Sequence, residues 1–136
     1  MGNGRETIMT HPNEDLIRRG YDAFAAGDIE ALNEVFADDV AWRSAGDNPL
    51  AGDYHGKQEV FGLFARLNEL ADSFEQELHD LLANDEHGVA LVKVRASRGD
   101  RTMEQNVVHV FHLADGKVKE FWLHNFDQAT VDAFWQ

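Results

Sequence analysis

Cysteine is absent from this sequence, and its absence removes several kinds of site at once. Such a chain has no disulfide framework, no thiolate metal site, no iron–sulfur cluster and no cysteine nucleophile. Long apolar runs are also missing, since no stretch approaches the roughly 20 residues of a membrane-spanning helix. The start, MGNGRETIMTHPNED, lacks the apolar core of a secretion signal. We therefore expect a soluble, cytoplasmic protein.

Positive charge is scarce, with 12 Lys and Arg residues against 25 Asp and Glu residues and a formal net charge of −13. This excess of negative charge repels phosphate backbones and anionic lipid headgroups, so neither nucleic acid nor a membrane is an expected partner. What the sequence does contain is 43% hydrophobic residues and 10% aromatic residues in a length of 136. That is enough for a single hydrophobic core.

One domain is predicted over residues 11–136, after a polar and flexible leader over residues 1–10. In the first half, apolar residues recur at the spacing of amphipathic helices. The helices predicted from this spacing run from Asn13 to a C-cap at Gly27, from a cap at Asp28 to Asp39, and over residues 60–71.

A short strand is predicted over residues 40–44, followed by an irregular loop over residues 45–55. Beyond the third helix the period changes, and strand-length segments are separated by the turn sequences NDEHG, RGDR and ADG. These strands are predicted over 74–83, 88–97, 102–113 and 117–126, before a short helix capped by Asp127. Helices followed by an antiparallel meander indicate an α+β domain, with helices packed on one face of a curved sheet.

Three phrases, YDAFAAGDIEALNEVFADDVAW, LAGDYHGKQEVFGLF and VVHVFHLADGKVKEFW, occur in this order and cover most of residues 14–126. In them the sequence resembles the nuclear-transport-factor-2-like superfamily, and within it the SnoaL-like and ketosteroid-isomerase-related group. The resemblance implies a cone, in which a curved antiparallel sheet wraps around the three helices and leaves an internal, open-ended apolar pocket. It also implies a homodimer formed through the outer face of the sheet. It does not choose among isomerases, cyclases, hydrolases and non-catalytic members.

The residues that steroid isomerases of this fold use are not present here. Those enzymes hold an enolate oxygen with a tyrosine and a protonated aspartate, and they use a second aspartate as the base. By the resemblance, the position of the tyrosine falls on Gly20, that of the base on Ser44 and that of the oxyanion aspartate on His109. All three roles are unfilled or changed, so we do not expect steroid isomerisation by that set of residues.

The segment HVFHLADGKVKEFWLHN, residues 109–125, places three histidines within two predicted strands. His109 lies among apolar residues, and a neutral imidazole there can donate and accept a hydrogen bond, which suits acid–base work. A core histidine satisfied by a neighbour is the equally weighted alternative. His112 falls on the opposite face of the strand, and the two side chains diverge too far to share a metal ion. No metal site is predicted.

The turn at ADG decides where Trp122 and His124 lie, because these two residues share one face of the last strand. A two-residue Asp-Gly turn makes His109 face Trp122, and this register is preferred because Asp-Gly is the stronger two-residue turn signal. A three-residue turn instead places Phe121 and Asn125 on the side of His109. It turns Trp122 and His124 outward, toward a dimer interface.

The leading hypothesis is that the cone binds a small, largely apolar or amphipathic molecule. If it is an enzyme, cofactor-free isomerase, cyclase or hydratase chemistry is expected, with His109 and His124 as the catalytic candidates. The predicted ligand pocket consists of Tyr21, Trp42, Phe64, Phe111, Trp122 and Asn125. For Tyr21, a core position with a satisfied hydroxyl is the favoured alternative. The competing hypothesis is a non-catalytic ligand-binding or dimeric interaction module, with Lys93, Arg95 and His112 in the self-contact.

Overall fold

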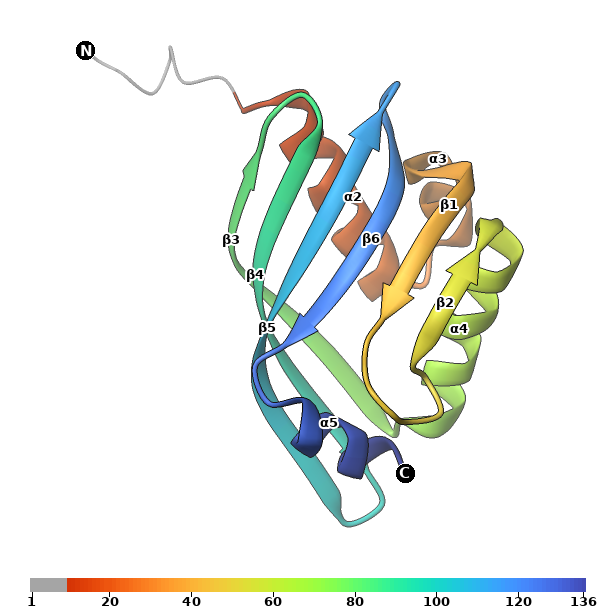
Figure 1. Cartoon of the computed structure of the whole chain (residues 1–136), viewed down its shortest axis with the longest axis vertical. Coiled ribbons are helices and arrows are strands. Elements are labelled where there is room, and N and C mark those ends of the chain that lie inside the picture. The colour runs from red at the N-terminus through yellow and green to blue at the C-terminus, as the bar shows by residue number, and fades with distance from the viewer. Residues whose placement is uncertain (1–9) are drawn as a thin grey trace, which may run out of the picture.

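The computed structural model describes residues 10–136 and shows four helices and one six-stranded sheet in them (Figure 1). The helices are α2 (Pro12–Ala26), α3 (Ile29–Val35), α4 (Gly56–Leu70) and α5 (Gln128–Trp135). The strands are β1 (Phe36–Ser44), β2 (Gly52–His55), β3 (Ser73–Ala83), β4 (His87–Arg98), β5 (Arg101–Ala114) and β6 (Lys117–Asn125). The predicted leader over residues 1–10 lies, apart from Thr10, outside the described residues.

The helix ends follow the caps that the sequence predicts. Gly27 ends α2 with a φ of 67°, a left-handed conformation that glycine adopts without strain. Asp28 caps α3 by accepting a hydrogen bond from the backbone N–H of Ala31 at 3.1 Å, and Asp127 caps α5 through that of Thr130 at 3.2 Å. These three predictions are confirmed.

The order of the strands in the sheet is β2-β1-β6-β5-β4-β3. Strands β3 to β6 form the predicted antiparallel meander, but β1 runs parallel to β6, so the sheet is mixed rather than antiparallel throughout. The α+β class is confirmed and the all-antiparallel sheet is wrong. The alternation of apolar residues predicts where strands lie. It does not predict which strands pair when they are far apart in the chain.

Two predictions near β1 are also wrong. The second helix ends at Val35 rather than at Asp39, because the chain enters β1 at Phe36, whose side chain is buried in the core. The segment predicted as an irregular loop over residues 45–55 contains β2, which pairs with β1 from Ser44–Gly52 to Ala41–His55. The sequence GDYH lacks the alternation of apolar residues that identifies strands, so this short edge strand is defined by its pairing alone.

Figure 1 shows α2, α3 and α4 on one side of the curved sheet, with α5 at the end where β4 and β5 bend. The inward side chains of the sheet alternate along each strand, and the buried set includes Val92, Val107, Phe111, Val118 and Phe121. Within residues 10–136, no helix is both long and apolar enough to span a bilayer.

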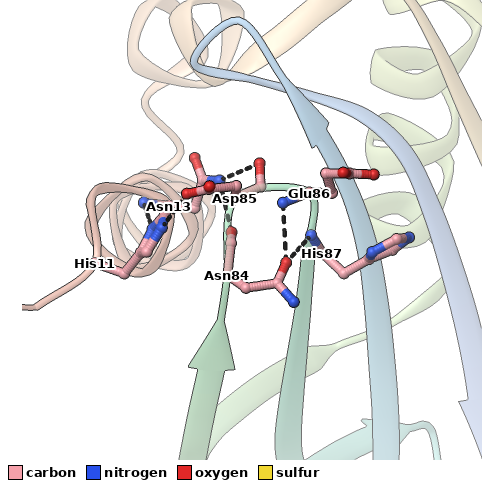
Figure 2. A network of polar contacts seen from close by, with 6 residues as sticks. All are labelled: His11, Asn13, Asn84, Asp85, Glu86 and His87. Atoms are coloured by element: carbon pink, nitrogen blue, oxygen red, sulfur yellow. Dashed lines mark hydrogen bonds and ion pairs between the residues drawn. The ribbon is translucent and has the colours of Figure 1, made fainter.

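The start of α2 is tied to the turn between β3 and β4 by a polar network, which Figure 2 shows. The amide nitrogen of Asn13 donates to the backbone carbonyls of Asn84 at 2.9 Å and Asp85 at 3.1 Å. The side chain of His11 contacts Asp85 at 2.9 Å, and its other ring nitrogen accepts the N–H of Asn13 as the helix cap. This network fixes the height at which α2 lies across the sheet, and therefore the position of Tyr21 two turns further along.

The hairpin between β5 and β6 contains a two-residue turn followed by a bulge. Asp115 and Gly116 have φ values of 54° and 72°, as the predicted Asp-Gly turn requires, and Ala114 pairs with Lys117 across it. The register then shifts between Leu113 and His112, which pair with Val118 and Glu120. One extra residue therefore lies on β6 beyond the turn.

This bulge overturns the preferred register further along the strands. His109 pairs with Leu123, and Trp122 pairs with Val110 on the outer face. The prediction that His109 faces Trp122 is wrong, although the turn on which it rested is correct. Since side chains alternate, one extra residue moves every later side chain of β6 to the opposite face.

Candidate functional site

A cavity of about 140 Å³ lies between the helices and the inner face of the sheet. Most of its lining is apolar, and its aromatic rings include those of Tyr21, Phe24, Trp42, Phe64, Phe74, Phe111 and Phe121, which come from six helices and strands. Its polar lining comes from neutral side chains only: Tyr21, Ser44, Asn48, Gln76, His109 and Asn125. An apolar cavity with a few polar groups is the usual form of a small-molecule site.

The polar centre of this cavity is a hydrogen-bonded pair from α2 and β5. The hydroxyl of Tyr21 lies 2.5 Å from Nδ1 of His109, and the two rings are nearly parallel with centroids 5.9 Å apart. His109 is only 4% exposed, and the ring of Phe121 lies against it at a centroid distance of 4.8 Å. The pair is therefore held inside a shell of aromatic side chains.

Burial keeps both members of this pair uncharged. Desolvation lowers the pKa of His109 to about 3 and raises the pKa of the Tyr21 hydroxyl above its ordinary value. An imidazole nitrogen accepts a hydrogen bond better than a phenol oxygen, so we assign Tyr21 as the donor to Nδ1. The ring proton of neutral His109 then resides on Nε2.

Nε2 of His109 makes no hydrogen bond to any residue in the described range 10–136. An N–H group buried without a partner is costly, and such groups are rare in folded proteins. Because His109 borders the cavity, a molecule in the cavity that carries an acceptor atom would satisfy this donor.

A stack of aromatic rings adjoins this pair. Trp42 from β1 lies nearly parallel to Phe121 with ring centroids 3.6 Å apart, and Phe64 from α4 meets the indole edge-on at 5.1 Å. These contacts fill the space beside the cavity and leave a flat apolar surface facing it.

The sequence-predicted site residues fall into two groups. His109, Tyr21, Trp42, Phe64, Phe111 and Asn125 border the cavity. The prediction for Trp122 and His124 is wrong in position, since the bulge in β6 places both on the outer face, where His124 is exposed. A pairing of His109 and His124 in one catalytic site is therefore excluded by the geometry.

The structure adds lining residues that the preferred register missed. Phe121 and Leu123 occupy the inward positions of β6, and Gln76 and Ser44 contribute polar groups from β3 and β1. The alternative with a three-residue turn had placed Phe121 on the side of His109, so the correct face of β6 was one of the two that the sequence predicted. No local signal marks the bulge itself.

His112 lies on the outer face, as predicted, where its ring stacks on that of His87 with centroids 5.2 Å apart. Neither histidine meets a third ligand: in residues 10–136, no three His, Asp or Glu side chains converge in a way that could hold a metal ion.

One end of the cavity is closed by the loop over residues 45–51, which is fastened to α5. The Oδ1 atom of Asp132 accepts hydrogen bonds from the Asp47 backbone N–H at 3.0 Å and the Asn48 amide at 2.7 Å. Gly46 approaches α5 so closely that a Cβ atom there would overlap the side chains of Gln128 and Asp132. A side chain at Gly46 would push the loop away from the helix.

Known proteins resemble this chain over nearly its whole length. An uncharacterized protein of Mycobacterium tuberculosis is 32% identical over 123 residues, which cover 89% of this chain and 94% of that protein. Bal32a, from a soil-derived mobile gene cassette, has a TM-score of 0.88 and 29% identity, with 92% of this chain and 97% of Bal32a covered.

Two further solved structures share the fold at lower identity. An NTF2-like protein from Burkholderia pseudomallei has a TM-score of 0.84 and 23% identity, covering 93% of this chain and 99% of that one. TerC, crystallized with polyporic acid, has a TM-score of 0.82 and 19% identity, covering 91% and 98%. They confirm the NTF2-like cone expected from the sequence. The family model of the SnoaL-like domain matches residues 17–121, and the chain belongs to this family.

Proposed function

We propose that the protein binds a small, neutral, largely apolar molecule in the cavity and holds an acceptor oxygen of that molecule with Nε2 of His109. The observation that carries this proposal is the buried Tyr21–His109 pair, whose one remaining polar atom has no partner among the described residues. The lining contains no Lys, Arg, Asp or Glu, so a carboxylate or ammonium inside the cavity would lose its hydration without gaining an ion pair.

The same pair supports cofactor-free proton-transfer chemistry of the isomerase, cyclase or hydratase type. Nε2–H stabilises a carbonyl oxygen as negative charge develops on it, since a preorganised donor in a dry site acts strongly there. If Nε2 gave up its proton completely and Tyr21 passed its own to Nδ1, Tyr21 would be left as a buried phenolate, a form that desolvation disfavours, so the pair acts by donating a hydrogen bond from Nε2 rather than by losing a proton.

The fold neighbours support a role in small-molecule binding. TerC was crystallized with polyporic acid, and it shares the whole cone with this chain. At 19% identity that likeness concerns the fold, so the choice of ligand for this chain rests on its own cavity.

Binding of one-ring probes tests this proposal, because a cavity of about 150 Å³ holds benzene. NMR titration of the backbone amides with acetophenone, ethylbenzene and benzoate compares an acceptor, its apolar counterpart and an anion. We expect acetophenone to bind most tightly and benzoate not to bind. In His109→Phe the preference for acetophenone over ethylbenzene is expected to fall about tenfold, the effect of one buried hydrogen bond.

His124→Phe is the matched control, since it removes an outward histidine from the neighbouring strand and should leave all three affinities unchanged. If none of the probes shifts resonances around the cavity, the binding proposal is wrong. If acetophenone binds His109→Phe as tightly as it binds the wild type, then His109 is not the recognition group.

A second candidate is a dimeric interaction module, and one feature of the outer sheet face favours it. Leu82, Val89, Val110 and Trp122 form one cross-strand row over β3, β4, β5 and β6. Leu82 is 57% exposed. We propose that a second copy of the chain covers this row, because contiguous exposed apolar surface marks interaction sites.

Analytical ultracentrifugation checks this proposal. Wild-type protein should sediment as a dimer at high concentration, and Val110→Arg should sediment as a monomer, because it places a charge in the centre of the row. Gln58→Arg, on the exposed surface of α4, is the control that adds the same charge elsewhere. A wild-type monomer at every concentration would refute the dimer.

A further inference from the structure

A second cavity adjoins the first, and its volume is about 350 Å³. It lies between the C-terminal ends of α2 and α4 and the beginning of β3, elements whose arrangement Figure 1 shows. Four residues border both cavities: Tyr21, Phe24, Phe74 and Gln76. The two spaces are therefore separated by a wall one side chain thick, to which Tyr21 of the buried pair belongs. We refer to them as the inner and outer cavities.

The two cavities differ in chemistry. The inner one is lined mainly by apolar and aromatic side chains, whereas half of the outer lining is polar. The polar side chains at the outer cavity are those of Asn68, Asp72 and Gln76, and its lining contains no Lys, Arg or His. Ser73 and Glu75 also border it, but their side chains alternate with those of Phe74 and Gln76 along β3 and lie on the opposite face of the strand. Acceptor atoms and negative charge therefore prevail in it.

Gln76 provides a free polar group at the boundary. It is half-buried on β3, and its side-chain amide forms no hydrogen bond with any residue of the described range. A half-buried amide gains from a partner that can donate to its oxygen or accept from its nitrogen. A ligand that reaches through the wall would supply that partner.

The remaining part of the wall consists of aromatic rings rather than backbone. Phe24 meets Phe74 edge-on with centroids 6.1 Å apart, and Phe24 meets Phe64 in the same way at 5.1 Å. For a ligand to reach from one cavity to the other, these side chains would rotate, and no strand or helix would need to move.

The volume of the inner cavity limits the size of the ligand that it can hold. The inner cavity matches the engineered cavities of about 150 Å³ that hold a single benzene ring. Sites for larger ligands usually occupy about 300–1,000 Å³. A molecule with more than one ring must therefore extend beyond the inner cavity, and the outer cavity is the adjoining space.

We propose that the outer cavity is a second subsite for the same ligand, and that Gln76 determines specificity between the two subsites. This inference rests on the proposed function of the inner cavity. The ligand class it names has two parts: an apolar ring that occupies the inner cavity, and an arm with hydrogen-bond donors, hydroxyl or amine, that occupies the outer one. A carboxylate arm is disfavoured by the negative charge of Asp72.

The test compares acetophenone with derivatives that carry an arm at the 3′ or the 4′ position. The arms are 2-hydroxyethoxy, 2-aminoethoxy and carboxymethoxy, and NMR titration gives each dissociation constant. For one positional isomer we expect the hydroxyl and amine arms to tighten binding about three- to tenfold over acetophenone, as one or two hydrogen bonds at a partly exposed site would. The carboxylate arm should weaken binding.

Variants assign any gain to the outer cavity. Gln76→Leu should abolish the gain from both arms, measured as the ratio of each arm's affinity to that of acetophenone in the same variant, because Gln76 borders the inner cavity as well as the outer one. Asp72→Asn should reduce the gain from the amine arm and spare the hydroxyl arm. Glu69→Gln is the control, since it removes one exposed charge from the same end of α4 outside the outer cavity.

The outcomes separate this inference from the proposed function. If acetophenone does not bind at all, the proposed function fails and this inference with it. If acetophenone binds but neither arm tightens binding, or if the gain persists in Gln76→Leu, the inner site stands and the outer subsite is refuted.

Discussion

The free energy of unfolding is expected to fall by about 1.4 kcal/mol for each pH unit below pH 6.5, through His109 alone. The ordinary pKa of 6.5 applies to this histidine in the unfolded chain, and burial lowers it to about 3 in the folded protein. Between these two values the unfolded state binds a proton that the folded state does not. Acidification therefore favours unfolding, and the slope ends where the folded state is protonated as well.

Urea unfolding followed at a series of pH values measures this slope, with His109→Phe as the comparison. The variant lacks the titrating group, so the difference in slope between the two proteins isolates His109. The window from pH 6.5 to about 4.5 lies above the range in which Asp39, Asp127 and Asp132 affect stability, because their pKa values are lowered below the ordinary aspartate value by hydrogen bonds. His124→Phe, at an exposed site on the neighbouring strand, is the matched control.

Identical slopes for wild type and His109→Phe would mean that the imidazole reaches water in the folded protein. The dry cavity would then be the wrong description. The lowered pKa of His109 also constrains its chemistry: at neutral pH His109 acts as a neutral N–H donor, with Tyr21 hydrogen-bonded to Nδ1. An imidazolium acid in this cavity is disfavoured by the same desolvation.

Much of the fold could be predicted from the sequence, because local residue patterns indicate where helices and strands begin and end. Gly27, Asp28 and Asp127 mark helix ends through conformations and caps that need no long-range partner. The four strands of the meander follow from alternation and turn residues. Strand β2 and the parallel pairing of β1 with β6 were missed, since both depend on contacts between segments distant in the chain.

The site was predictable only in part, for a related reason. Alternation along β5 correctly placed His109 and Phe111 inward, because both positions lie on one strand with no irregularity between them. Tyr21 was predicted to be a core residue with a satisfied hydroxyl, and its partner proved to be His109 itself. The side chains of β6 that line the cavity were predicted wrongly, because a bulge inserts one residue into this strand. No turn residue in the sequence marks that bulge.

Phe121 and its neighbour Trp122 give the sharpest test of that register. Phe121 is 2% exposed and packs against Trp42 and His109. We therefore expect Phe121→Ala to lower the free energy of unfolding by about 3–5 kcal/mol, the usual effect of deleting a buried aromatic side chain. Trp122 is half-buried on the outer face, and Trp122→Ala should cost about 1 kcal/mol in the separate protomer.

Urea unfolding of both variants at two protein concentrations measures these effects and separates the two faces. The loss in Phe121→Ala should be the same at both concentrations, because the cavity wall lies within one chain. Any additional loss in Trp122→Ala should depend on concentration if the outer row is a dimer interface, since mass action couples assembly to stability. In the register without the bulge the order of the two costs reverses, so a larger loss for Trp122→Ala at low concentration would contradict the placement of His109 against Phe121.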